Sequence, residues 1–75
     1  MKAELGIQPL DGIMARLGFS NADLVKISTE QLSHKMVQKG RKGRRLTPNV
    51  QRKILRALRA LEPEGNFTIK DIFNY

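Results

Sequence analysis

The chain has 75 residues, 40% of them hydrophobic, which allows one small core but is too short for an enclosed substrate cavity of ordinary size. It has no cysteine, which excludes disulfide scaffolds and cysteine-based zinc sites. Its longest apolar runs are two or three residues, far below the roughly 18 needed to cross a bilayer, so we expect a cytoplasmic protein.

The formal net charge of +7 is unevenly distributed along the chain. Between Glu30 and Glu62 there are ten basic residues and no acidic one, whereas the remainder has four basic and seven acidic residues. These ten are Lys35, Lys39, Arg41, Lys42, Arg44, Arg45, Arg52, Lys53, Arg56 and Arg59. Such a stretch repels itself unless a polyanion binds it, and nucleic acid is the commonest polyanion because neutralising its phosphates releases counterions.

The first two predicted helices are short. Residues 1–8 are expected to be irregular, and residues 9–17 to be helical, because apolar side chains recur at helical spacing and a glycine follows: Leu10, Ile13, Met14 and Leu17. Ser20 and Asp23 have the spacing of a capping box, which predicts a second helix over residues 20–27 with Leu24 facing inward.

The third predicted helix begins only a few residues later. Ser28 and Gln31 repeat the capping spacing, with Thr29 as a competing N-cap. We therefore predict a helix over residues 29–39, whose apolar positions are Leu32, Met36 and Val37. Residues 40–45 contain two glycines and four positive charges, which is typical of a loop or of a fraying helix end.

The fourth predicted helix has the clearest pattern. Thr47 is a good N-cap, and a proline follows it, so the helix is expected over residues 48–61. One face is apolar, with Val50, Ile54, Ala57, Leu58 and Leu61, and another is basic, with Arg52, Arg56 and Arg59. Residues 63–65 end it. Thr68 and Asp71 then open a last short helix, whose core residues are Ile69, Ile72 and Phe73. The fold class predicted is all-α, a single domain built as a bundle of about five short helices.

The second and third predicted helices are the right pair for a helix-turn-helix, in which one helix crosses the DNA backbone and the next enters the major groove. The polar face of the third helix carries the candidate base-reading residues Gln31, His34, Lys35 and Gln38. Glutamine can pair with adenine, lysine can reach guanine acceptors, and histidine can donate or accept. The candidate phosphate contacts are Lys39, Arg41, Lys42, Arg44, Arg45, Arg52 and Arg56.

The chain also resembles the Cro and phage-repressor (XRE-type) family of helix-turn-helix domains. The matching motifs lie between about Leu17 and Phe73: Leu17-Gly18-Phe19-Ser20, Gly40-Arg41, Thr47-Pro48, the stripe Ile54, Ala57 and Leu58, and the closing set Thr68, Asp71, Ile72 and Phe73. The resemblance implies a five-helix fold, DNA contacts from the third helix and phosphate contacts from the loop after it. The glycine that this family usually has in the turn is absent, since Lys26 or Ser28 stands there.

The sequence favours a DNA-binding transcriptional regulator of bacterial or phage type, binding double-stranded DNA and as a homodimer on two half-sites. We expect no enzyme activity, no cofactor and no small-molecule ligand, because no catalytic or nucleotide-binding motif is present, and a metal role for the single histidine, His34, is not expected either. Two alternatives stay open: an RNA-binding or ribosome-associated basic protein, and an antitoxin-like protein-interaction module. The RNA-binding alternative is disfavoured because the chain lacks exposed aromatic residues on which RNA bases would stack.

Overall fold

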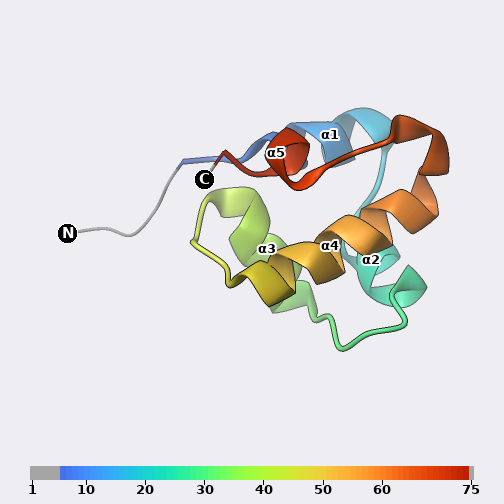
Figure 1. The fold of residues 1–75 in the computed structure, drawn as a ribbon, viewed down its shortest axis with the longest axis horizontal. Helices are drawn as coiled ribbons and strands as arrows, with labels where there is room; N and C mark the ends of the chain where they lie inside the picture. The colour runs from blue at the N-terminus through green and yellow to red at the C-terminus, as the bar shows by residue number, and fades with distance from the viewer. Residues whose placement is uncertain (1–5, 75) are drawn as a thin grey trace.

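The computed structural model describes residues 6–74, and within this range the chain forms five α-helices joined by short connections (Figure 1). The elements in chain order are α1 (Pro9–Leu17), α2 (Asn21–Ile27), α3 (His34–Lys42), α4 (Pro48–Leu61), a 3-10 turn η1 (Pro63–Gly65) and α5 (Ile69–Ile72). This confirms the predicted all-α bundle. Residues 6–8 are non-helical as expected, whereas residues 1–5 lie outside the described range. None of the described helices combines the length and apolar character required for a membrane span.

Four of the five helices begin where predicted, α1 from its apolar spacing and α2, α4 and α5 from their capping residues. Pro9 is the first residue of α1, and the capping box of Ser20 and Asp23 opens α2, with the backbone N–H of Ser20 donating to the Asp23 carboxylate at 2.8 Å. The hydroxyl of Thr47 accepts from the backbone of α4, and Thr68 forms a capping box at α5. Local hydrogen bonds at the helix ends therefore determine the starts of α2, α4 and α5.

Helix α3 begins later than predicted, at His34 and not at residue 29. Its N-cap is Ser33, whose hydroxyl accepts a hydrogen bond from the backbone N–H of Met36 at 3.2 Å. The hydroxyl of Ser28, the expected cap, instead accepts from the backbone N–H of Glu30 at 3.1 Å and forms a local turn after α2. The predicted start is thus wrong, and residues 28–33 form a non-helical connection between α2 and α3.

Helix α3 also ends later than predicted, because Gly40 lies within the helix and is buried. A side chain at Gly40 would lie 3.0 Å from the side chain of Leu46 and 3.3 Å from the ring of Phe73, so the missing Cβ allows these residues to pack against α3. The helix stops at Gly43, which adopts the left-handed conformation with φ 96°. Of the two structures predicted for residues 40–45, a helix end is therefore found up to Lys42 and a loop after it.

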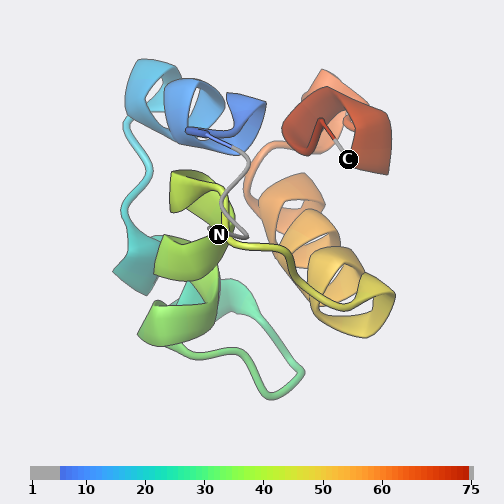
Figure 2. The same ribbon diagram turned by 90° about the vertical axis from the view of Figure 1, so that its left-hand side faces the viewer.

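The core lies between α4 and the other helices. Figure 2 shows α3 in front of α2, with α1 above it and α4 beside it, and contacts link α3 to all three of these helices. The buried side chains come from every helix and from the connection before α3: Leu10, Ile13, Met14, Leu24, Leu32, Val37, Ile54, Leu55, Ala57, Leu58, Ile72 and Phe73. Burying these aliphatic groups supplies the main driving force for folding.

The two ends of the described range meet at Gln8, which is 1% exposed. Its side-chain oxygen accepts from the backbone N–H of Asn74 at 2.8 Å, and its side-chain nitrogen donates to the carbonyl of Gly6 at 2.9 Å. Its backbone N–H donates to the carbonyl of Arg41 in α3 at 3.0 Å. Residue Gln8 thus joins the beginning of the bundle, the segment after α5 and the last turn of α3.

Candidate nucleic-acid interface

The outer face of α3 is polar and carries positive charge. An α-helix turns about 100° per residue, so five exposed residues of α3 fall within an arc of about 140°. They are His34, Lys35, Gln38, Lys39 and Lys42, and we call them the α3 face. The residues on the opposite side, Met36, Val37, Gly40 and Arg41, are buried or half-buried. Helix α3 therefore separates an inner side that packs on the bundle from an outer side that is accessible to a partner.

Three of the four predicted base-reading residues lie on the α3 face, and Gln31 does not. Gln31 is exposed in the connection between α2 and α3, outside the helix that was expected to contain it. Its backbone carbonyl accepts a hydrogen bond from Nζ of Lys53 at 3.2 Å. The placement of Gln31 on a helical face with His34 is consequently corrected: the late start of α3 puts Gln31 on another element.

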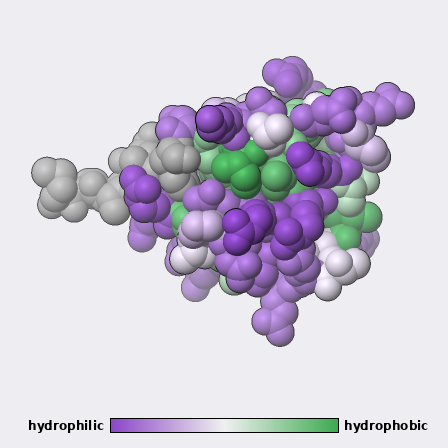
Figure 3. All heavy atoms as spheres, viewed as in Figure 1, coloured by the Kyte–Doolittle hydropathy of each residue, from purple (hydrophilic) through white to green (hydrophobic). Residues whose placement is uncertain are grey.

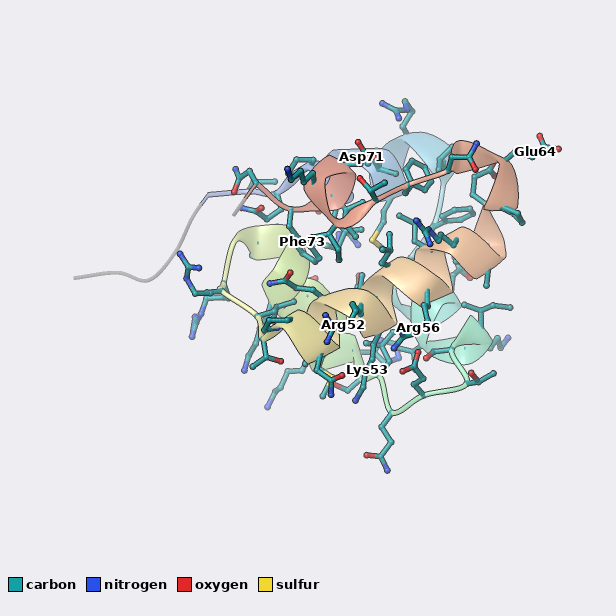
Figure 4. The ribbon with its side chains drawn as sticks, viewed as in Figure 1. Arg52, Lys53, Arg56, Glu64, Asp71 and Phe73 are labelled. Atoms are coloured by element: carbon teal, nitrogen blue, oxygen red, sulfur yellow. The ribbon has the colours of Figure 1, made fainter. Side chains whose placement is uncertain are left out.

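Two cations of α4 hold the connection before α3 against the bundle. Arg56 donates from Nε and Nη2 to the two carboxylate oxygens of Glu30, at 2.5 and 2.6 Å, and Lys53 binds the carbonyl of Gln31. Figure 4 shows both side chains on the same side of α4 as the connection. The hydrogen bonds from Arg56 lower the pKa of Glu30, the charges of Arg56 and Lys53 lower it further, and desolvation partly opposes them. Arg56, expected at a phosphate, is engaged with Glu30 within the protein.

Arg41, another predicted phosphate contact, is half-buried and binds within the bundle. Its Nε donates to Asp11 Oδ1 of α1 at 2.7 Å, and its Nη1 donates to Asn21 Oδ1 of α2 at 2.7 Å. The amide nitrogen of Asn21 in turn donates to Oε1 of Gln38 at 2.9 Å. Arg41 therefore ties three helices together beneath the α3 face.

Four residues that hold this site escaped the sequence reasoning: Asp11, Asn21, Glu30 and Lys53. Their partners are 17 to 30 residues away along the chain, so no local pattern marks them. The excess of basic residues without interleaved acids was the closest signal, since it implied that any acidic partner must come from outside that stretch. This excess did not indicate which arginines pair with an acidic residue.

The remaining predicted phosphate contacts extend the basic surface beyond α3. Arg44 and Arg45 are exposed in the connection between α3 and α4, and Arg52 is exposed in the second turn of α4. Figure 3 shows hydrophilic side chains over the first half of α4, with a smaller apolar patch between α4 and α5. In Figure 4, Glu64 and Asp71 lie away from Arg52, at the far end of α4 and on α5. Cations are thus concentrated on α3 and the start of α4, and neither α3 nor α4 contains an acidic residue.

The described residues contain no group of three His, Asp or Glu side chains that is arranged to hold a metal ion.

Comparison of the chain with protein-family models, with curated proteins and with solved structures found no match.

Proposed function

We propose that the protein binds double-stranded DNA in a sequence-specific manner, as a helix-turn-helix domain of the Cro and phage-repressor type, and acts as a small transcriptional regulator. The observation that carries the proposal is the composition of the α3 face. It combines three lysines with a histidine and a glutamine, and none of the five residues is acidic. A uniformly basic surface would bind any polyanion. This mixture instead combines lysines that attract phosphates with polar groups that can distinguish base edges.

The proposed mechanism places α3 in the major groove, with α2 packed behind it. His34, Lys35 and Gln38 are the candidate base readers. The phosphates on either side of the groove are bound by cations at the end of α3 and after it, namely Lys39, Lys42, Arg44 and Arg45, with Arg52 as a further contact from α4.

In this proposal, two arginines that the sequence suggested as phosphate contacts have a structural role instead. Arg41 and Arg56 position the elements of the interface through Asp11 and Glu30. The connection of residues 28–33 is longer than the turn of about three or four residues that is usual in this motif, and the contacts from α4 hold it in place. A module of this size buries only about 600–1,000 Å² on DNA, so a dimer on two half-sites is the expected form on an operator.

The test is binding of labelled duplexes at several salt concentrations, after selection of bound duplexes from a random pool. The five phosphate contacts of one module predict a slope of log K against log[salt] of roughly −4.5, which is about a 500-fold loss of affinity between 50 and 200 mM salt. Replacing Arg44 and Arg45 by glutamine should weaken binding to all sequences and make the slope shallower by about 1.8.

The matched control removes the same two charges from helices outside the interface, by Arg16→Gln in α1 and Lys70→Gln in α5, both exposed. It should retain most of the slope. The proposal fails if both double variants lose affinity equally, if RNA of the same sequence binds more tightly than the duplex, or if no nucleic acid binds near physiological salt. The last two results would favour the RNA-binding and the protein-interaction alternatives respectively.

A further inference from the structure

A chain of hydrogen bonds runs from α1, through the half-buried Arg41, to the α3 face. Asp11 of α1, Arg41 of α3 and Asn21 of α2 follow one another in it, and we call these three residues the polar relay. The relay ends on Gln38, which is exposed. Every link measures between 2.7 and 2.9 Å, so each is a good hydrogen bond.

The donors and acceptors of the polar relay can be assigned in only one way, because Arg41 cannot accept a hydrogen bond. A guanidinium has N–H donors and no acceptor, so the atom of Asn21 beside Arg41 must be its carbonyl oxygen. The NH₂ group of Asn21 is then the atom that faces Gln38, and it requires an acceptor. The carbonyl oxygen of Gln38 therefore points inward to α2. Asp11 fixes the guanidinium of Arg41 from the other side and balances its charge.

We infer that the polar relay fixes the side-chain amide of Gln38 with its NH₂ group outward, so that α3 presents a hydrogen-bond donor at this position. A free glutamine amide offers a donor and an acceptor together, which suits adenine. Here Asn21 occupies one lone pair of the Gln38 oxygen, while both N–H groups are without a partner among the described residues. The expected partner is thus an acceptor-rich edge, such as N7 and O6 of guanine. This part of the inference rests on the proposed function, whereas the orientation of the amide does not.

The orientation is tested in the free protein by NMR. A scalar coupling across the hydrogen bond, from Nδ2 of Asn21 to the side-chain carbonyl carbon of Gln38, is expected. In Asn21→Asp the new carboxylate still accepts from Arg41 but offers Gln38 only an acceptor. The Gln38 amide should then turn over, and the coupling should originate from its own nitrogen. An aspartate is favoured in the first turn of a helix, so this variant should fold. A wild-type Gln38 nitrogen coupled to Asn21 would overturn the inference, as would the absence of any coupling between the two side chains.

The base preference is tested by duplex selection with the wild type, with Asn21→Asp and with Asn66→Asp. The last variant adds the same charge after η1, at a left-handed residue that aspartate tolerates. Wild type and Asn66→Asp should share a guanine at one position of the site. Asn21→Asp should lose that preference and bind the wild-type site about tenfold or more weakly, the size expected for one specific base contact.

A phosphate oxygen is also a hydrogen-bond acceptor. The variant Gln38→Ala distinguishes a contact to guanine from a contact to a phosphate. Loss of preference at a single position identifies a guanine contact, whereas equal weakening on all duplexes identifies a phosphate and overturns the guanine assignment. Retention of the guanine by Asn21→Asp would also overturn it. If none of the proteins binds duplex DNA, the proposed function fails, while the coupling in the free protein still decides the direction of the amide.

Discussion

Replacing Gly43 by alanine should destabilise the protein strongly, because two separate costs meet at this residue. Gly43 has φ 96°, a left-handed conformation that costs a residue with a Cβ about 1–2 kcal/mol. The added Cβ would also collide with the carbonyl group of Gly6, so residues 6–8 must move. That movement would break or weaken the hydrogen bond from Gln8 to the carbonyl of Arg41, which contributes about 0.5–1.5 kcal/mol to the free energy of unfolding. We expect a total loss of roughly 2–3 kcal/mol, a large part of the stability of a domain of this size.

Urea unfolding followed by helical circular dichroism measures this loss, and two other glycines separate its parts. Gly18 is also left-handed, with φ 77°, but a Cβ there meets nothing within 4 Å, so Gly18→Ala should cost only the conformational term of about 1–2 kcal/mol. Gly12 lies inside α1 with the same free space, so Gly12→Ala should stabilise by about 0.5–1 kcal/mol. If Gly43→Ala costs no more than Gly18→Ala, residues 6–8 do not pack on the end of α3, and the reasoning is refuted.

Three further predictions concern stability. The folded protein holds the pKa of Glu30 below its ordinary 4.5, so the contribution of Glu30 is complete above pH 4.5 and is lost as the pH falls through the folded value. The urea midpoints of wild type and Glu30→Gln should therefore differ at neutral pH and converge on acidification; parallel pH profiles would contradict this. Ser33→Ala should cost about 1 kcal/mol because it removes the N-cap of α3, whereas Thr29→Ala should change the free energy of unfolding by less than about 0.5 kcal/mol. A larger effect at Thr29 would restore the earlier predicted start. Asp11→Asn keeps an oxygen for Arg41 but removes the charge, and a loss of about 1 kcal/mol in urea unfolding is expected; an unchanged midpoint would show that the ion pair adds nothing.

Most of the helices could be predicted because their ends are determined locally. A capping side chain bonds backbone groups of the next three residues, so Ser20, Thr47 and Thr68 mark helix starts without reference to the rest of the fold. The apolar spacing within each helix likewise reports which side faces the core, as Ile54 and Leu58 do in α4.

The limits of α3 could not be predicted in this way, because distant contacts decide between competing local signals. Ser28 and Ser33 are both acceptable caps, and the bonds of Arg56 and Lys53 to the connection favour the second, across 22 to 26 residues. Gly40 is a plausible helix end by itself. It remains helical because its missing side chain leaves room for Phe73, which is 33 residues further on.

The shared face of three candidate residues was predicted better than the limits of the helix that carries them. His34, Lys35 and Gln38 share one face wherever α3 begins, because the spacing within a helix does not depend on its first residue. Gln31 was misplaced because its position did depend on that start. For Arg41, the sequence gives a positive charge but not the carboxylate that meets it, and Asp11 is 30 residues away.

The bonds made by Gln8 have a consequence for how the molecule folds. The link to Asn74 spans 66 residues, so it forms only once nearly the whole polypeptide is in place. The bond from the backbone N–H of Gln8 to Arg41, in the last turn of α3, spans 33 residues and is separate from it. A chain that ends before Asn74 would therefore keep the bond between Gln8 and α3, but the buried side-chain oxygen of Gln8 would lose its partner, so the end of the bundle would close less firmly.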